Sequence, residues 1–153
     1  GGEGYQTRVV DGLLQIKADS AMLGYLNAPS PFTEDGWFKT GDEVIVDGEY
    51  YKILGRKSDI INVGGEKVYP SEVENVIMEV DIVEAVAVFG EPNAILGNIV
   101  CARVKLISPE SKGEIVQRIK AHCGQRLEKY KRPIKIILTN ESVYSARYKV
   151  KRR

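Results

Sequence analysis

Cationic side chains crowd the end of the sequence, in YSARYKVKRR, where five of the last seven residues are Lys or Arg. One of these cations could take part in chemistry by stabilising negative charge. The same residues could instead form a solvated charge run or a patch that grips nucleic acid. Upstream, Asp42 could accept two hydrogen bonds from vicinal hydroxyls, and the guanidinium of Arg56 offers rigid donors to oxygen ligands.

The composition weighs against several of these functions. The 22 basic residues nearly balance the 21 acidic ones, and Tyr144 and Tyr148 are the aromatic residues of the basic end, so a small non-enzymatic nucleic-acid module is the weaker hypothesis. Cys101 and Cys123 lack the spacing of metal ligands, so we predict buried free thiols and no metal site. His122 precedes Cys123 in a helical pattern, where adjacent side chains point about 100° apart and do not face one another.

The first third of the sequence, rich in Gly, Pro, Asp and aromatic residues, predicts short strands between turns. Leu13 to Ala18 is one such strand. A hairpin is predicted where Glu43 to Val46 and Glu49 to Leu54 flank Asp47-Gly48, a dipeptide that favours a type I′ turn.

After Gly55 the pattern becomes mixed. A small hairpin turning at Gly64-Gly65 precedes a helix whose apolar residues recur at helical spacing, with Ser71 and Glu74 as a capping box at its start. A second helix, with Ser111 and Glu114 as its capping box, is predicted around Ile115 to Leu127. The remaining predicted strands are Val83 to Phe89, Ile99 to Ile107 and Ile134 to Leu138.

This order predicts an α+β fold: a small domain with a short β-hairpin and a three-stranded sheet flanked by helices, preceded by a β-rich segment. The sequence has no apolar run long enough to span a bilayer and no signal segment at its start, so we expect a cytoplasmic protein without a membrane segment.

Three segments together resemble the adenylate-forming superfamily of acyl-CoA synthetases, peptide-synthetase adenylation domains and luciferases. They are GWFKTGD at 36–42, GRKSDIINVGGEKVYPSEVE at 55–74, and SARYKVKRR at the end; GYLN at 24–27 adds a weaker likeness. The matches run in the family's order and cover nearly the whole chain. The form VYPSEVE is similar to acyl-CoA ligases more than to peptide-synthetase domains.

The resemblance implies that the chain is a fragment. Residues 1–55 would be the β-rich end of the large N-terminal domain, and residues 56–153 the whole mobile C-terminal domain. The phosphate loop, the acid pocket and the Mg²⁺ site would lie in the missing N-terminal domain, the partner of this chain within the same protein. The isolated chain is therefore expected to be inactive.

The resemblance also implies roles for individual residues. Asp42 and Arg56 would bind the nucleotide, and Ser58 and Asp59 would form the hinge, although the family usually has Asp or Lys where this chain has Ser58. The loop at Gly64-Gly65 would line the CoA channel, while the same glycines are also explained by a plain hairpin turn or a phosphate cradle.

At the basic end, the family's Lys-x-x-Arg pattern aligns with Lys149 to Arg152, which makes Lys149 the catalytic cation. Tyr148 stands where the family usually has glycine, and Arg147 replaces a small or polar residue, so Lys151 is an alternative. Composition alone predicts a solvated charge run for Lys151 to Arg153.

The predicted function is the C-terminal part of an AMP-forming acyl-CoA ligase that uses ATP, Mg²⁺ and CoA to activate a carboxylic acid. The alternatives are an adenylation domain that loads a carrier protein and the basic binding module considered above. The acid substrate is not encoded here, because its pocket would lie upstream.

Overall fold

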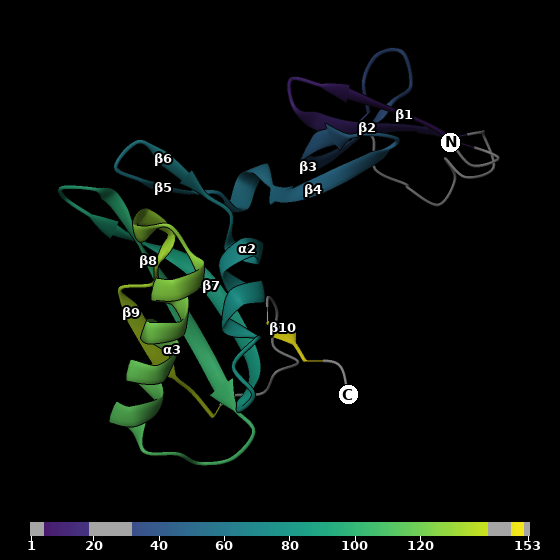
Figure 1. Cartoon of the computed structure of the whole chain (residues 1–153). Helices are drawn as coiled ribbons and strands as arrows, with labels where there is room; N and C mark the ends of the chain where they lie inside the picture. Colours follow the sequence, from purple (N-terminus) through teal and green to yellow (C-terminus); the bar gives the residue numbers. More distant parts are fainter. Residues whose placement is uncertain (1–4, 19–31, 141–147, 152–153) are drawn as a thin grey trace. The chain divides into compact units, whose positions relative to one another are not determined.

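A computed structural model describes residues 5–18, 32–140 and 148–151, which form two compact units. The first unit is residues 1–58 and the second is residues 59–153, and the description below takes each unit by itself (Figure 1). Among the described residues, no helix combines the length and the apolar character that crossing a bilayer requires.

The described part of the first unit is an antiparallel four-stranded sheet in the order β1-β2-β3-β4. Its strands are β1 (Tyr5–Val10), β2 (Leu13–Ala18), β3 (Phe38–Asp47) and β4 (Tyr50–Arg56). The strand predicted at Leu13 to Ala18 is confirmed. Each strand pairs with its neighbour in the sequence, which is the simplest way to connect β-rich runs separated by turns.

The predicted β3-β4 hairpin is confirmed, but its turn lies one residue later than predicted. Asp47 pairs with Tyr50, so the two turn residues are Gly48 and Glu49. Of these two, only Gly48 has a positive φ, +63°. A glycine in the first central position with positive φ is the requirement of a type II′ turn, so the type I′ turn centred on Asp47-Gly48 is wrong.

The second unit contains a six-stranded sheet in its described residues, in the order β10-β7-β8-β5-β6 with β9 paired to β8. The strands are β5 (Ile61–Val63), β6 (Glu66–Val68), β7 (Val83–Asn93), β8 (Gly97–Leu106), β9 (Lys135–Leu138) and β10 (Lys149–Val150). Strand β9 is parallel to β8, and the other pairs are antiparallel. The α+β class, the small hairpin and the three predicted strands β7, β8 and β9 are therefore confirmed. The sheet has six strands in place of the predicted three, because the hairpin strands β5 and β6 and the short strand β10 join it.

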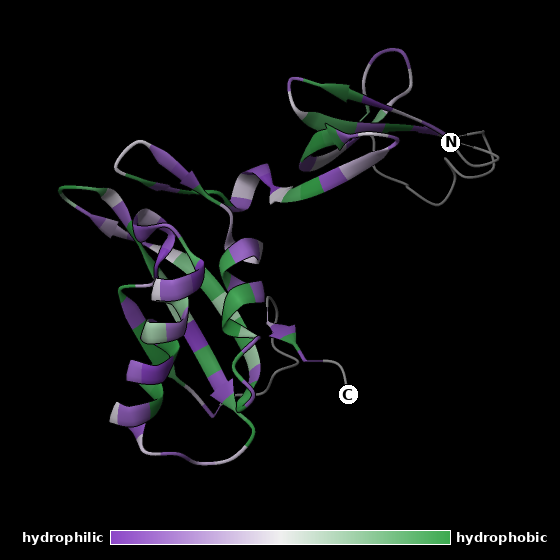
Figure 2. Ribbon diagram, viewed as in Figure 1, coloured by the Kyte–Doolittle hydropathy of each residue, from purple (hydrophilic) through white to green (hydrophobic). Residues whose placement is uncertain are grey.

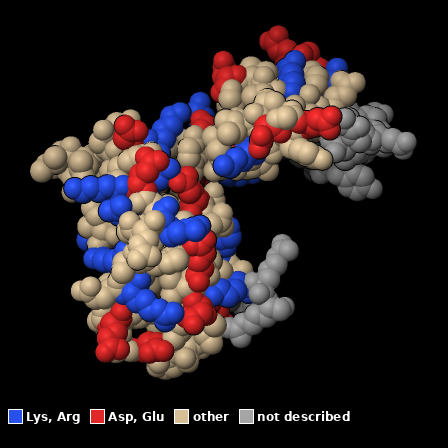
Figure 3. Space-filling model, viewed as in Figure 1, with Lys and Arg blue, Asp and Glu red and all other residues tan. Residues whose placement is uncertain are grey.

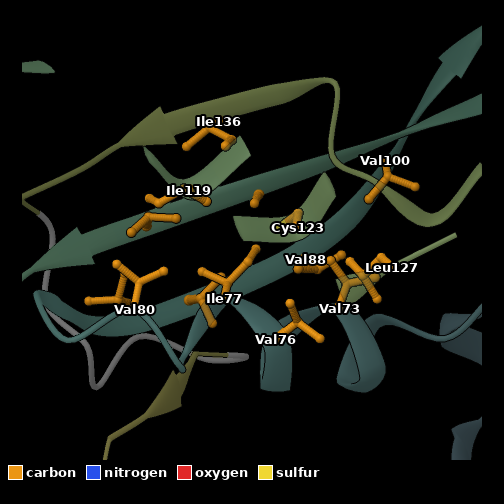
Figure 4. Close-up of a cluster of buried hydrophobic side chains, with 14 of the residues drawn as sticks. Val73, Val76, Ile77, Val80, Val88, Val100, Ile119, Cys123, Leu127 and Ile136 are labelled. Atoms are coloured by element: carbon orange, nitrogen blue, oxygen red, sulfur yellow. The ribbon is translucent and has the colours of Figure 1, made fainter. Parts of the chain in front are cut away.

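Helices α2 (Pro70–Ile77) and α3 (Lys112–Arg126) pack against this sheet, and their buried side chains meet those of β7 and β8 (Figures 1 and 4). Ile77 and Ile119 are completely buried at the centre. Burying such a side chain stabilises the fold by about 1.5–3 kcal/mol. The predicted apolar stripes of the two helices are confirmed. In Figure 2, hydrophobic residues lie along the strands, and hydrophilic residues alternate with hydrophobic ones along α3.

The capping boxes predicted for the two helices are not formed. Helix α2 begins at Pro70 after Tyr69, without a side-chain cap, because proline suits the first helical turn, where a backbone N–H has no partner in any case. Ser111 does precede α3, but its side chain makes no capping hydrogen bond. The side chain of Glu74 has a different partner, given below.

Charged pairs join α3 to the turn that follows α2. Arg118 pairs with Asp81 at 2.6 Å, and Arg126 with Glu79 at 2.9 Å. The drawn face of this unit in Figure 3 accordingly shows blue and red side chains intermixed over the helices. Such exposed pairs each contribute about 0.2–1 kcal/mol, so the apolar core dominates the stability.

Candidate functional site

The segment Thr40-Gly41-Asp42 lies in strand β3, and its local hydrogen bonds fix Asp42. The Thr40 hydroxyl donates to the carbonyl of Leu14 on β2 at 2.8 Å, and the same oxygen accepts from the backbone N–H of Asp42 at 3.2 Å. Gly41 has φ +78°, a conformation that glycine adopts without strain. The threonine and glycine thus orient the carboxylate that follows them.

Asp42 and Arg56 lie opposite each other across strands β3 and β4. They are paired in the register of the sheet, and Arg56 Nε lies 3.7 Å from Asp42 Oδ1. The Asp42 side chain is 26% exposed and that of Arg56 is 61% exposed. A carboxylate and a guanidinium held side by side at a solvent-accessible place offer acceptors for hydroxyl groups and donors for oxygen ligands.

Trp37 and Phe38, which precede this segment, have neighbours within the first unit. The guanidinium carbon of Arg8 lies 4.3 Å from the Trp37 ring centre. The Phe38 ring packs against Phe32, with their centres 5.5 Å apart. Their role in the described structure is therefore packing.

The predicted hinge residues Ser58 and Asp59 lie in a short 3₁₀ helix, η1 (Lys57–Asp59), whose residues are all exposed. The division between the two compact units falls directly after Ser58. Domain boundaries commonly fall in exposed segments of this kind. The domain boundary at residues 55 and 56 and the hinge role stay predictions.

The Gly64-Gly65 turn is a hairpin turn whose amides already have partners. The φ angles are +57° and +88°, as a type I′ turn between β5 and β6 requires. The N–H of Gly64 donates to the carbonyl of Leu96 at 2.7 Å, and that of Gly65 donates to Asn62 Oδ1 at 3.1 Å. Because both donors are engaged, the structure favours the hairpin interpretation over a phosphate cradle, and the CoA-channel role stays a prediction.

Lys149 begins strand β10, which pairs antiparallel with β7 so that Lys149 lies opposite Val86. Its Nζ donates a hydrogen bond to the side-chain oxygen of Asn75 on α2. Tyr148, which stands where the family usually has glycine, directly precedes this strand and does not have the positive φ that would require glycine. Arg147, Arg152 and Arg153 lie outside the described residues.

Composition predicted a solvated charge at Lys151, and this is wrong, because the ammonium of Lys151 donates hydrogen bonds to backbone carbonyls. Its Nζ donates to the carbonyl of Val80 at 3.0 Å and to that of Asp81 at 3.2 Å, in the turn that follows α2. Its backbone N–H also donates to the carbonyl of Glu84 at 2.8 Å. These turn carbonyls give Lys151 structural partners, so Lys149 is the more accessible of the two ammonium groups.

Glu74, predicted as a capping residue, is a half-buried acid beside Lys149. Its Oε2 accepts the backbone N–H of Val88 on β7 at 2.9 Å. Burial raises the pKa of Glu74, which the hydrogen bond from Val88 and the positive charge of Lys149 partly offset. The sequence carried no local signal for this role, because the partner Val88 lies 14 residues away on strand β7.

The histidine and cysteines have structural roles, as predicted. Cys101 and Cys123 are buried free thiols, and burial raises the pKa of Cys123 to about 11. His122 Nε2 lies 2.8 Å from Glu79 Oε1, away from a thiol. In the described residues, no three His, Cys, Asp or Glu side chains converge as metal ligands would.

The chain is similar to known proteins over most of its length, and part of its second unit matches a family model. Residues 72–146 match the family model described as the AMP-binding enzyme C-terminal domain. The 2-succinylbenzoate–CoA ligase of Enterococcus faecalis is 38% identical over 143 residues, which are 91% of this chain and 28% of that protein. The long-chain-fatty-acid–CoA ligase FadD13 of Mycobacterium tuberculosis is 39% identical, over 83% of this chain and 25% of that protein.

Solved structures show the same likeness. The o-succinylbenzoate CoA synthetase MenE from Bacillus subtilis, in complex with its acyl-adenylate intermediate, superposes with a TM-score of 0.74 at 30% identity, over 91% of this chain and 31% of that one. ATP-bound MatB from Rhodopseudomonas palustris superposes with a TM-score of 0.73 at 27% identity, over 96% of this chain and 32% of that one. The chain thus spans between a quarter and a third of the length of these relatives.

Proposed function

This chain belongs to the adenylate-forming enzymes and carries their C-terminal domain, and from that premise we propose that it is the C-terminal part of an AMP-forming acyl-CoA ligase. The complete enzyme would activate a carboxylic acid with ATP and transfer the acyl group to CoA. The observation that supports this most is the likeness to a CoA ligase over 91% of the chain, which runs through both compact units.

In the first step of the proposed reaction, a carboxylate oxygen of the acid attacks the α-phosphorus of ATP. The bond between that phosphorus and the bridging oxygen of the β-phosphate breaks, and pyrophosphate leaves with the electron pair. Both reactants are anions, so the barrier is largely electrostatic, and a correctly placed cation lowers it. We assign this role to Lys149, which is exposed on β10.

The nucleotide would be held by the pair Asp42 and Arg56. The Asp42 carboxylate can accept hydrogen bonds from both ribose hydroxyls, and Arg56, 3.7 Å away, can donate to ribose or phosphate oxygen. As the family resemblance implies, the Mg²⁺ that accompanies ATP would be bound by the large N-terminal domain.

In the second step, the thiol of CoA attacks the carbonyl carbon of the acyl-adenylate, the thiol loses its proton, and AMP leaves. Rotation about Ser58 and Asp59 would remove Lys149 from the site and bring the Gly64-Gly65 turn to the channel through which CoA enters. Residues 1–55 would stay with the large domain and residues 56–153 would move.

The test of this proposal uses the full-length enzyme and the 153-residue chain side by side. The full-length enzyme should exchange pyrophosphate with ATP when its acid is present, and should form a thioester with CoA in preference to a carrier protein. The isolated chain should show no exchange, since the phosphate loop and acid pocket are missing. Exchange by the isolated chain, or thioester formation only on a carrier protein, would contradict the proposal.

A further inference from the structure

We propose that Asn75 is a positioning residue for Lys149, holding one N–H of its ammonium so that the other two can face the reacting anions. This inference rests on the catalytic role proposed above for Lys149. It assigns a function to a helix residue that none of the family motifs quoted above places at the reaction centre.

The contact joins two elements that are distant in the sequence. Asn75 lies on α2, and Lys149 lies on β10, 74 residues later. Pairing of β10 with β7, through Lys149 opposite Val86, brings the backbone of Lys149 alongside the helix. The Asn75 side-chain oxygen then accepts the hydrogen bond from Lys149 Nζ.

A lysine side chain needs such a partner if it is to act at a defined point. Its four-carbon stem is flexible, and Lys149 is exposed, so without a contact its ammonium would sample many rotamers. An ammonium carries three N–H donors. One donated to Asn75 leaves two, which is the number needed to contact a carboxylate oxygen and a phosphate oxygen together.

The acceptor in this contact is uncharged, and this suits the proposed reaction. A carboxylate in the place of Asn75 would neutralise the ammonium, whereas an amide oxygen orients it and leaves the positive charge for the substrates. Glu74, an acid whose pKa burial raises and the charge of Lys149 partly lowers, has a different partner, since its Oε2 accepts the N–H of Val88 at 2.9 Å.

The strand that carries Lys149 is itself held at its other end. Lys151 donates to the carbonyls of Val80 and Asp81, and its N–H donates to the carbonyl of Glu84. These contacts fix the backbone after Lys149, and Asn75 fixes the tip of its side chain. Together they define where the ammonium lies relative to the second unit.

The test compares the two half-reactions in the full-length enzyme. Asn75→Ala should slow adenylate formation, measured by ATP–pyrophosphate exchange, by about tenfold, a factor equivalent to one hydrogen bond of a charged group. Formation of the thioester from a supplied acyl-adenylate should be unchanged. The matched control is Glu79→Ala, which removes contacts between the segment after α2 and α3 without touching Lys149 and should leave both half-reactions unchanged.

A second measurement follows the contact itself, by NMR of the Lys149 side chain in the 153-residue chain. Asn75→Ala should lower the order of the Lys149 ε-methylene group, Asn75→Asp should restore it by keeping an oxygen in place, and Lys151 should be unaffected. Unchanged order in Asn75→Ala, an equal loss of both half-reactions, or adenylation as fast as in the wild type would overturn the inference. Absence of exchange by the wild-type enzyme would instead refute the proposed function itself.

Discussion

Replacing Lys151 by methionine is expected to loosen strand β10 without unfolding the second unit. Methionine keeps most of the apolar stem but loses the ammonium, which donates to the carbonyls of Val80 and Asp81 at 3.0 and 3.2 Å. Hydrogen bonds from a charged group are worth about 1.5–3 kcal/mol when buried, and Lys151 is partly exposed, so a loss of about 1 kcal/mol is expected.

That loss matters because β10 is short. It has two paired residues, Lys149 opposite Val86 and Val150 opposite Ala85, plus the hydrogen bond from the Lys151 N–H to Glu84. A change of about 1 kcal/mol alters a local opening equilibrium about fivefold.

The assay is hydrogen–deuterium exchange of the 153-residue chain followed by NMR. The Lys151 amide should exchange about fivefold faster in Lys151→Met, while the amide of Ile119 in α3 keeps its wild-type rate. Lys120→Met, on the exposed side of α3, is the matched control and should change neither rate. Unchanged exchange at Lys151, or an equal acceleration at Ile119, would refute the reasoning.

Three further predictions concern the second unit. Burial raises the pKa of Glu74 in the folded protein above its value in the unfolded chain. The protonated side chain therefore stabilises the fold at pH values below the unfolded-state pKa, and this stabilisation is lost as the pH rises through the folded-state pKa. Glu74→Gln stays neutral and keeps an acceptor for Val88, so its stability relative to the wild type should increase as the pH rises above about 4 in urea titrations; a constant difference would contradict this. Ile119→Ala should lower the free energy of unfolding by about 2–5 kcal/mol in the same assay, since Ile119 is completely buried, and a loss below about 1 kcal/mol would show that the core relaxes around it. The Cys123 thiol, with its pKa raised to about 11, should resist Ellman's reagent at about pH 8 until urea is added, and rapid labelling of the native chain would disprove its burial.

Elements with a strong periodic signal were predictable from the sequence. The apolar residues of α2 and α3 recur at helical spacing, and the β-branched runs of β7 and β8 are long, so both helices and both strands lie where the patterns place them. Turn positions were less secure, because Gly48 can serve either of two turn types and the register of the pairing decides between them.

Side-chain partners distant in the sequence could not be predicted. The contacts of Lys149 with Asn75 and of Lys151 with the turn after α2 exist only because β10 pairs with β7, and a two-residue strand carries no periodic pattern. Glu74 likewise satisfied a capping rule locally, but the N–H of Val88 on the neighbouring strand gave it a more favourable buried partner.

Asp42 and Arg56 illustrate how motifs and structure complement each other. The family motifs name the two residues separately, 14 positions apart in the sequence. The β3-β4 hairpin then places them in register, with 3.7 Å between their charged groups. Neither residue alone distinguishes a turn aspartate or a solvated arginine from a nucleotide site, but their pairing at an accessible position supports the proposed ribose contact.

The assignment of Lys149 is tested most directly by Lys149→Ala in the full-length enzyme, with the two half-reactions measured separately. Adenylate formation, followed by ATP–pyrophosphate exchange, should be abolished, because the cation between the two anions is gone. Thioester formation from a supplied acyl-adenylate and CoA should continue at the wild-type rate. An equal loss of both half-reactions, or undiminished exchange, would contradict the role assigned to Lys149.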